Sequence, residues 1–176
     1  MRTALLLGVA LAFASSGKVE SHAVPPTAQA LLVDAQGTEL GRATFAQLPQ
    51  GVLIKLKASN LPPGVHGFHI HAGGACHAPA FASAGGHFNP DGKSHGFKNP
   101  NGPHAGDLPN LTVPPNGTVD VETLAKRVTL EEGPNSLFKE GGTSLMIHAD
   151  PDDYLSDPSG NSGARIACGS ITLLAR

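Results

Sequence analysis

Tryptophan is absent from this chain of 176 residues, and aromatic residues together make up only 5% of it. A hydrophobic core must therefore be built mainly from aliphatic side chains. Charge of neither sign predominates: the formal net charge is −2, which excludes a generally basic surface of the kind that coats nucleic acid. No nucleic-acid partner is expected.

Long apolar runs are missing as well. The longest, residues 4–14, has about eleven residues, whereas a membrane-spanning helix needs roughly 20. This run follows Arg2 and ends in the small-x-small triplet Ala12-Phe13-Ala14, which is the pattern of an export signal. Ser21-His22-Ala23 offers a second cleavage site. We predict cleavage after Ala14 or Ala23, and no membrane association of the chain that remains.

This signal divides the chain. Residues 1–23 are predicted to be a signal peptide and flexible leader, and residues 24–176 have the length of one folded domain. Export also bears on the two cysteines, Cys76 and Cys168. In an exported chain an even count suggests one disulfide, and two buried free thiols are the alternative.

Glycine and proline are abundant, with 22 and 15 copies. They form turn signals, such as Asp34-Ala35-Gln36-Gly37, between short segments of strand-like sequence. The predicted strands cover residues 28–33, 39–45, 52–57, 66–71, 111–113, 119–124, 128–130, 144–148 and 165–174. We see no strong amphipathic helix and no internal repeat. The sequence therefore predicts an all-β domain of about eight strands, with long loops on one side.

Most of the nine histidines lie in, or just before, one long segment without periodicity, residues 72–109. A loop of this length inside one domain is normally functional or disordered, and its density of candidate ligands favours function. In the strand predicted before it, alternation puts His69 and His71 on one face and His66 on the other. His69 and His71 can therefore grip one metal ion, whereas His66 is expected to be a hydrogen-bonded structural residue.

Ligand type divides the candidates into two sets that share one residue. Four imidazoles suit copper, since Cu(II) accepts a tetragonal set of nitrogens; the candidates are His69, His71, His87 and His148. Three nitrogens and one oxygen suit a closed tetrahedral zinc site; the candidates are His87, His95, His104 and Asp107. Spacing alone leaves open whether His87 bridges two ions.

Four motifs carry a family resemblance. They are Gly64-Val65-His66-Gly67-Phe68-His69-Ile70-His71, Gly86-His87-Phe88-Asn89-Pro90, Gly102-Pro103-His104-Ala105-Gly106-Asp107-Leu108 and Gly163-Ala164-Arg165-Ile166-Ala167-Cys168-Gly169. In residue types and order they resemble the signatures of the copper,zinc superoxide dismutase family. The long interval from Cys76 to His87 and the short one from His148 to Arg165 resemble the bacterial periplasmic branch.

The resemblance implies an eight-stranded Greek-key β-barrel, of the immunoglobulin-like sandwich type, with long metal-binding and electrostatic loops. It implies one copper and one zinc ion per chain, with copper on the four-imidazole set and zinc on the set that contains Asp107. It also implies a disulfide between Cys76 and Cys168. Asp152 matches a carboxylate that links a copper ligand to a zinc ligand.

The implied activity is dismutation of superoxide to O2 and hydrogen peroxide by alternate reduction and oxidation of the copper, which protects the cell envelope. Arg165 is the implied guide for superoxide, and His87 is implied to take up a proton during the cycle. The periplasm is the expected location, with secretion as the alternative. A monomer and a homodimer both stay open.

Two other interpretations compete. A non-catalytic copper/zinc-binding or metallochaperone-like domain of the same fold is expected to lose copper ligands or Arg165, or to gain a Cys-x-Cys site, and the sequence shows none of these changes. A cupin is expected to carry Glu shortly after its His-x-His pair, where Ala72-Gly73-Gly74-Ala75 follows here. The sequence favours the enzyme.

Overall fold

The computed structural model describes residues 27–174, so the predicted signal peptide and leader, residues 1–23, lie outside the described residues. Within this range the chain forms strands and one short 3-10 helix, η1 (Ala82–Ala84). The strands are β1 (Thr27–Asp34), β2 (Glu39–Leu48), β3 (Gly51–Ala58), β4 (Gly64–His66), β5 (Phe68–His71), β6 (Leu111–Val113), β7 (Val119–Ala125), β8 (Ser144–His148), β9 (Arg165–Ser170) and β10 (Thr172–Leu173).

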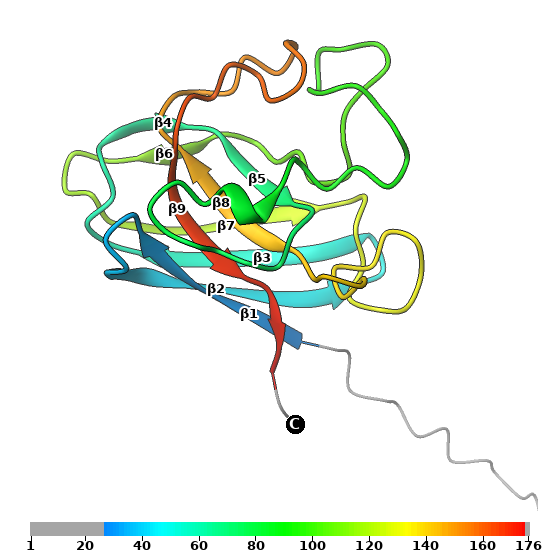
Figure 1. Ribbon diagram of the computed structural model, residues 1–176, viewed down its shortest axis with the longest axis horizontal. Helices are drawn as coiled ribbons and strands as arrows, with labels where there is room; N and C mark the ends of the chain where they lie inside the picture. The colour runs from blue at the N-terminus through cyan, green and yellow to red at the C-terminus, as the bar shows by residue number, and fades with distance from the viewer. Residues whose placement is uncertain (1–26, 175–176) are drawn as a thin grey trace, which may run out of the picture.

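Eight of the strands form one sheet, in the order β5-β8-β9-β1-β2-β3-β7, with β10 paired to β1. Each of these pairs is antiparallel, and β9, near the C-terminus, lies beside β1, near the N-terminus. The two remaining strands, β4 and β6, pair with each other. The sheet curls on itself (Figure 1), and its connections give the Greek-key β-barrel that was predicted.

The barrel core is mainly aliphatic, as the composition predicted. Alternate residues of β1, β2 and β3 are buried, as expected for strands with one face on the core. Side chains with at most 1% exposure include Leu32, Phe45, Ile54, Leu56, Ile70 and Leu145. The barrel carries some of the candidate ligands on its strands (His69, His71 and His148) and others on its loops (His87, His95 and His104).

One predicted strand, residues 66–71, is divided at Gly67. His66 pairs with Leu111 of β6, whereas Phe68 pairs with Ile147 of β8, so the chain changes partner between them. A Cβ atom on Gly67 would lie 2.7 Å from the side chain of Ser162, so only glycine fits this crossing. The division leaves His69 and His71 together on β5.

Two further strand predictions need correction. Residues 128–130 form no strand. Thr129 makes a single isolated bridge to Ser136, and Leu130 N–H donates to the side-chain oxygen of Gln47 instead of to a neighbouring strand. The last predicted strand, residues 165–174, is broken at Ile171. Its N–H donates to Thr143 O, next to the Ser144–Ser170 pair of β8 and β9, and the chain then resumes as β10 beside β1.

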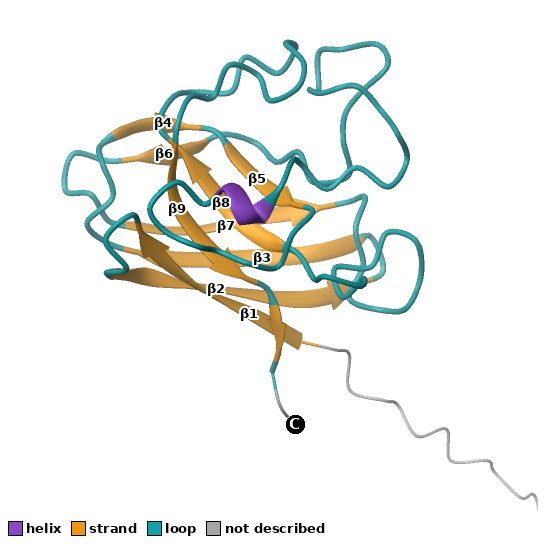
Figure 2. Ribbon diagram, in the orientation of Figure 1, coloured by secondary structure: helices purple, strands orange, loops and turns teal. Residues whose placement is uncertain are grey.

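The long connections gather around one end and side of the barrel, as Figure 2 shows. Residues 88–110 and 149–164 lie side by side there, and His95 N–H donates to Asp157 Oδ1 between them. In the segment predicted to lack periodicity, residues 72–109, η1 is the only helical turn that the structure describes. No helix among residues 27–174 has the length and apolar character needed to cross a membrane.

Candidate metal centre

Strand alternation places three histidines on the outer face of the barrel. Phe68 and Ile70 of β5 point into the core, so His69 and His71 project from the opposite face. His148 ends the neighbouring strand β8, and its ring centroid lies 5.0 Å from that of His69. His87 enters from the long loop, where its backbone makes a β-bridge to His71.

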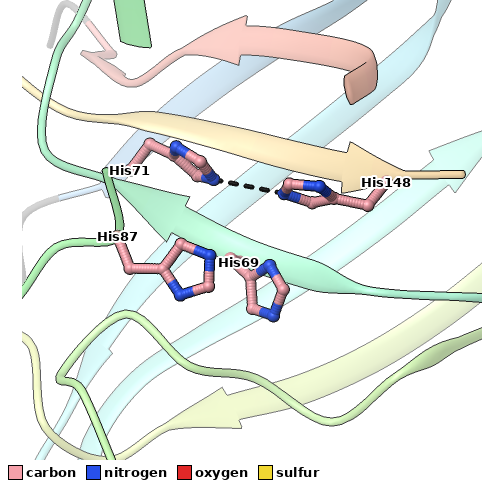
Figure 3. Close-up of side chains that lie close together, drawn as sticks. All are labelled: His69, His71, His87 and His148. Carbon is pink, nitrogen blue, oxygen red and sulfur yellow. Dashed lines mark hydrogen bonds between the residues drawn. The ribbon is translucent and has the colours of Figure 1, made fainter. Parts of the chain in front are cut away.

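These four imidazoles form the first candidate site. Figure 3 shows the rings of His69, His71, His87 and His148 turned toward one another. One nitrogen from each ring lies within 4.8 Å of the others, and all four side chains are buried. Nε2 of His71 is 3.3 Å from Nε2 of His148, and the rings of His69 and His87 are 4.0 Å apart. The group can hold one ion with four nitrogens.

A second group surrounds the carboxylate of Asp107. Its Oδ1 atom lies 2.9 Å from Nδ1 of His87, 3.2 Å from Nδ1 of His95 and 3.3 Å from Nδ1 of His104. Its Oδ2 atom accepts hydrogen bonds from the backbone N–H groups of Gly96 and His104, which fix the carboxylate. Three nitrogens and one oxygen thus converge in a buried position.

His87 belongs to both groups through its two nitrogens. Nδ1 contacts Asp107, whereas Nε2 is buried and makes no hydrogen bond. His69 Nδ1 and His95 Nδ1 are likewise buried without a hydrogen-bond partner. An unpartnered buried nitrogen is costly, and each of these three belongs to a cluster of other potential ligands. The residues therefore fit two metal ions, with His87 between them.

Asp152 links the two groups from behind. Its Oδ2 atom lies 2.8 Å from Nε2 of His69, and its Oδ1 atom lies 2.9 Å from Nε2 of His95. The side chain of Asn110 in turn bonds both the N–H and the carbonyl of Asp152. Each ring is placed to donate an Nε2–H hydrogen bond to the carboxylate, and in its neutral form it then offers its Nδ1 lone pair to a metal.

Burial sets the charge of these imidazoles. Desolvation, reinforced by neighbouring histidines, lowers the pKa of His71 to about 2, that of His148 to about 3 and that of His87 to about 4. Burial also acts to lower the pKa of His95, but the carboxylates of Asp107 and Asp152 outweigh it and raise that pKa to about 9. The first group is thus held neutral at pH 7, which is the form that binds metal.

Arg165, the first residue of β9, stands beside the first group. A hollow of about 310 Å³ opens onto His71, His87 and His148, and Arg165 lies in its wall. The Nη1 and Nη2 atoms donate to the carbonyl oxygens of Phe81 and Gly85, at 2.6 Å each. Among the described residues that line the hollow, Arg165 is the single positively charged side chain other than histidine.

His66 lies in neither group, in agreement with the strand alternation. It is buried, with Nδ1 2.8 Å from His148 O and Nε2 2.9 Å from Pro62 O. The ring therefore ties the start of a neighbouring loop to the end of β8. His66 is a hydrogen-bonded structural residue, as predicted.

The two cysteines form the predicted disulfide. Cys76 and Cys168 are bonded, with 5.6 Å between their Cα atoms, which excludes the alternative of two free thiols. Cys168 is in β9, three residues after Arg165, and Cys76 is in the loop that leads from β5 to His87. The bond fastens this loop to the sheet beside the first group.

Comparison with known proteins agrees with this geometry. The family model described as copper/zinc superoxide dismutase (SODC) matches residues 39–171. The chain belongs to this family. Two relatives from Aquifex aeolicus (strain VF5), named superoxide dismutase (Cu-Zn) 1 and 2, are 51% and 56% identical to it. The alignments cover 94% and 82% of this chain, and 95% and 85% of the relatives.

Solved structures of superoxide dismutases and related proteins have the same fold. The crystal structure of a SOD-like protein from Bacillus subtilis matches with a TM-score of 0.79 and 46% identity, over 81% of this chain and 96% of that one. The copper/zinc superoxide dismutase from Brucella abortus matches with a TM-score of 0.68 and 29% identity, over 83% and 99%. The predicted Greek-key barrel and family are therefore confirmed.

Sequence reasoning missed the residues that support the site through their backbones. The carbonyl of Gly85 contacts both Arg165 and, at 2.9 Å, Nδ1 of His71. Gly160 packs so closely on Asp152 that a side chain there would overlap the carboxylate. Every residue has a backbone carbonyl, and the chain has 22 glycines, so nothing in the sequence marks these particular positions as supports of the site.

Proposed function

We propose that this protein catalyses the dismutation of superoxide to O2 and hydrogen peroxide, and that each metal is held by one of the two groups described above. Copper and zinc are the metals of the family to which the chain belongs. Copper is assigned to the four-imidazole group, because Cu(II) accepts a tetragonal nitrogen set: His69, His71, His87 and His148. Zinc is assigned to the group that contains a carboxylate, because three nitrogens and one oxygen suit a tetrahedral site: His87, His95, His104 and Asp107.

The observation that carries this assignment is the double contact of His87. One ring nitrogen faces the carboxylate group, and the other is buried within the four-imidazole group without a hydrogen-bond partner. When bound, copper supplies alternate one-electron oxidation and reduction of superoxide, and zinc, which is not redox-active, supplies a fixed charge. Nε2 is then the atom at which the His87 ring can hold and return a proton.

Two residues outside the ligand sets support the site: Asp152 orients ligand rings, and Arg165 attracts the anion. Asp152 keeps the rings of His69 and His95 in one orientation and one tautomer. Arg165 presents a permanent positive charge to the hollow that leads to the copper group, and a local field of this kind can attract an anion to a protein of net negative charge. The reading as a non-catalytic metal-binding domain is disfavoured, because both groups and Arg165 are all present.

We further propose that the mature protein is exported and that the bacterial periplasm is its compartment. The intact disulfide supports this location, because disulfides persist in oxidising compartments, and the Aquifex and Brucella proteins named above are bacterial. The signal sequence read in residues 1–23 stays a prediction, and so does cleavage after Ala14 or Ala23. N-terminal sequencing of the exported protein tests it, and sedimentation of the same sample separates a monomer from a homodimer.

The proposed activity is tested by metal analysis of the mature protein together with a superoxide decay assay. One copper and one zinc per chain, with rapid decay that cyanide inhibits, is the expected result. His87→Ala should lower the content of both metals, because both groups lose a nitrogen. His77→Ala is the matched control, since His77 is exposed and outside both groups. A wild-type protein that holds zinc alone and leaves superoxide untouched would contradict the proposal.

A further inference from the structure

Phe81 is buried completely within a loop that is otherwise largely exposed. Its exposed fraction is 0%, whereas residues 77–80, 82 and 83 are all exposed. The ring packs in a small cluster with Ala84, Met146 and Cys168, separate from the barrel core. Small apolar clusters of this kind are common under long loops, and this one anchors the loop to the sheet through Phe81.

The cluster lies on the same face of the sheet as the copper group. Met146 of β8 pairs with His69 of β5 on one side and with Cys168 of β9 on the other. Residues paired across a sheet project from the same face, so the Phe81 ring covers the outer face of β8 and β9 beside the histidines. The disulfide enters the same cluster through Cys168.

The backbone of Phe81 is held in an unusual conformation. Its φ angle is 52°, in the left-handed region, which a residue with a bulky side chain rarely adopts. Phe81 N–H donates to His77 O, and Phe81 O accepts from Ala84 N–H in the turn η1. A strained residue persists only where its surroundings determine it. Here the buried ring does so together with the hydrogen bonds of the Phe81 backbone.

This turn presents two carbonyls to the site. Phe81 O accepts from Nη1 of Arg165, and Gly85 O, at the other end of η1, accepts from Nη2. Gly85 O also lies 2.9 Å from Nδ1 of His71. Among residues 27–174 no carboxylate forms an ion pair with Arg165, so neutral carbonyls hold the guanidinium and leave its positive charge uncompensated.

We propose that Phe81 is a positioning residue for anion binding: its buried ring locks the η1 turn, so that Phe81 O and Gly85 O hold Arg165 toward the copper group. This inference rests on the proposed function, since it concerns the anion that approaches the copper. The disulfide alone does not fix the turn, because Cys76 lies five residues before Phe81 and the intervening residues 77–80 are exposed. Hydrogen bonds from Gly73 N–H to Ala84 O and from the Ser83 hydroxyl to Ala75 O also hold the turn, and the ring anchors it to the sheet.

The test is the affinity of the copper-loaded, zinc-loaded protein for azide, a small anion whose binding to copper is followed by absorption and by electron paramagnetic resonance. Phe81→Ala is expected to weaken azide binding about tenfold, the size of a coupling between residues in contact. Phe81→Leu keeps a buried apolar side chain and should restore the affinity to within about twofold of wild type. Metal content and the disulfide are measured in each sample, so that loss of a metal is separated from loss of anion affinity.

Phe81→Gly separates the ring from the backbone strain. Glycine adopts the left-handed conformation without strain, so this variant is also the one to use if Phe81→Ala does not fold. It should weaken azide binding as much as Phe81→Ala does. Wild-type affinity in Phe81→Gly would show that the ring is not needed and would overturn the proposal.

A double-mutant cycle tests whether Phe81 acts through Arg165. In an Arg165→Ala background, Phe81→Ala should change azide affinity by less than about twofold, because the group that it positions is gone. Two full, additive effects would overturn the proposal. Failure of the proposed function would look different: the wild-type protein itself would bind no copper or would not consume superoxide.

Discussion

Nε2 of His69 lies 2.8 Å from Oδ2 of Asp152, and neither side chain is exposed to solvent. The second carboxylate oxygen bonds His95 of the other group, so one buried residue orients a ring in each candidate site. The two sites are therefore connected twice: His87 belongs to both groups, and Asp152 contacts the Nε2 atom of one histidine in each. A change at either residue should reach both metals.

Asp152→Asn tests the second connection. An amide has one acceptor oxygen, so it cannot take the place of both carboxylate oxygens in accepting hydrogen bonds from His69 and His95, and one ring loses its fixed tautomer. We expect the affinities for copper and zinc both to fall, by about 10- to 100-fold, as is typical when a partner of a metal ligand is lost. Competition with a chelator measures this. Asp153→Asn, the same change at a carboxylate that contacts no histidine, should leave both affinities unchanged.

Gly160→Ala tests the same carboxylate by steric means. Gly160 has a φ angle of +66°, and a Cβ atom there would overlap Oδ1 of Asp152. The variant should lose metal affinity in the same direction as Asp152→Asn. Gly92→Ala is the matched control, because its φ angle is +60° but a Cβ atom meets nothing within 4 Å. If the two alanine variants bind metals equally well, the packing of Gly160 on Asp152 does not matter for the site.

Sequence reasoning was most successful where a residue type and a fixed spacing both mark the feature. Strand alternation separated His69 and His71 from His66, and the two cysteines could form only one bond with each other. It was least successful where tertiary contacts decide the structure. Residues 128–130 have the apolar pattern of a strand, but the Gln47 side chain takes the place of a neighbouring strand. Apolar patterning cannot distinguish these two partners.

The pKa values predict how the metal-free protein responds to acid. Unfolded histidine titrates near pH 6.5, whereas burial lowers the pKa of His71, His87 and His148 to about 2, 4 and 3. Below pH 6.5 the unfolded chain therefore binds protons that the folded chain does not, and stability falls by up to about 1.4 kcal/mol per pH unit for each histidine. His95 has the opposite sign: its pKa is raised to about 9, so its contribution is complete below pH 6.5 and is lost as the pH rises through 9.

Urea unfolding of the metal-free protein at pH 7.0 and pH 5.0 checks this expectation. The midpoint should be lower at pH 5.0. The metal-loaded protein is the control, and its midpoint should fall less over the same range for as long as the metals stay bound, because the ions occupy the nitrogens that protons would take. Equal midpoints for the metal-free protein at the two pH values would mean that the folded site admits protons as readily as the unfolded chain.

Arg165→Ala should slow superoxide decay while both metals stay bound, because Arg165 lies in the wall of the hollow that leads to the copper group and is itself no ligand. The effect should be largest at low ionic strength, since the screening length falls from about 30 Å at 0.01 M salt to about 10 Å at 0.1 M.

Arg165→Lys keeps the charge but not the paired hydrogen bonds to Phe81 O and Gly85 O, so an intermediate rate is expected. Lys126→Ala is the matched control: it removes the same charge from the wall of a different hollow, so it should slow the decay much less than Arg165→Ala does. An unchanged rate in Arg165→Ala at every salt concentration would remove Arg165 from the mechanism.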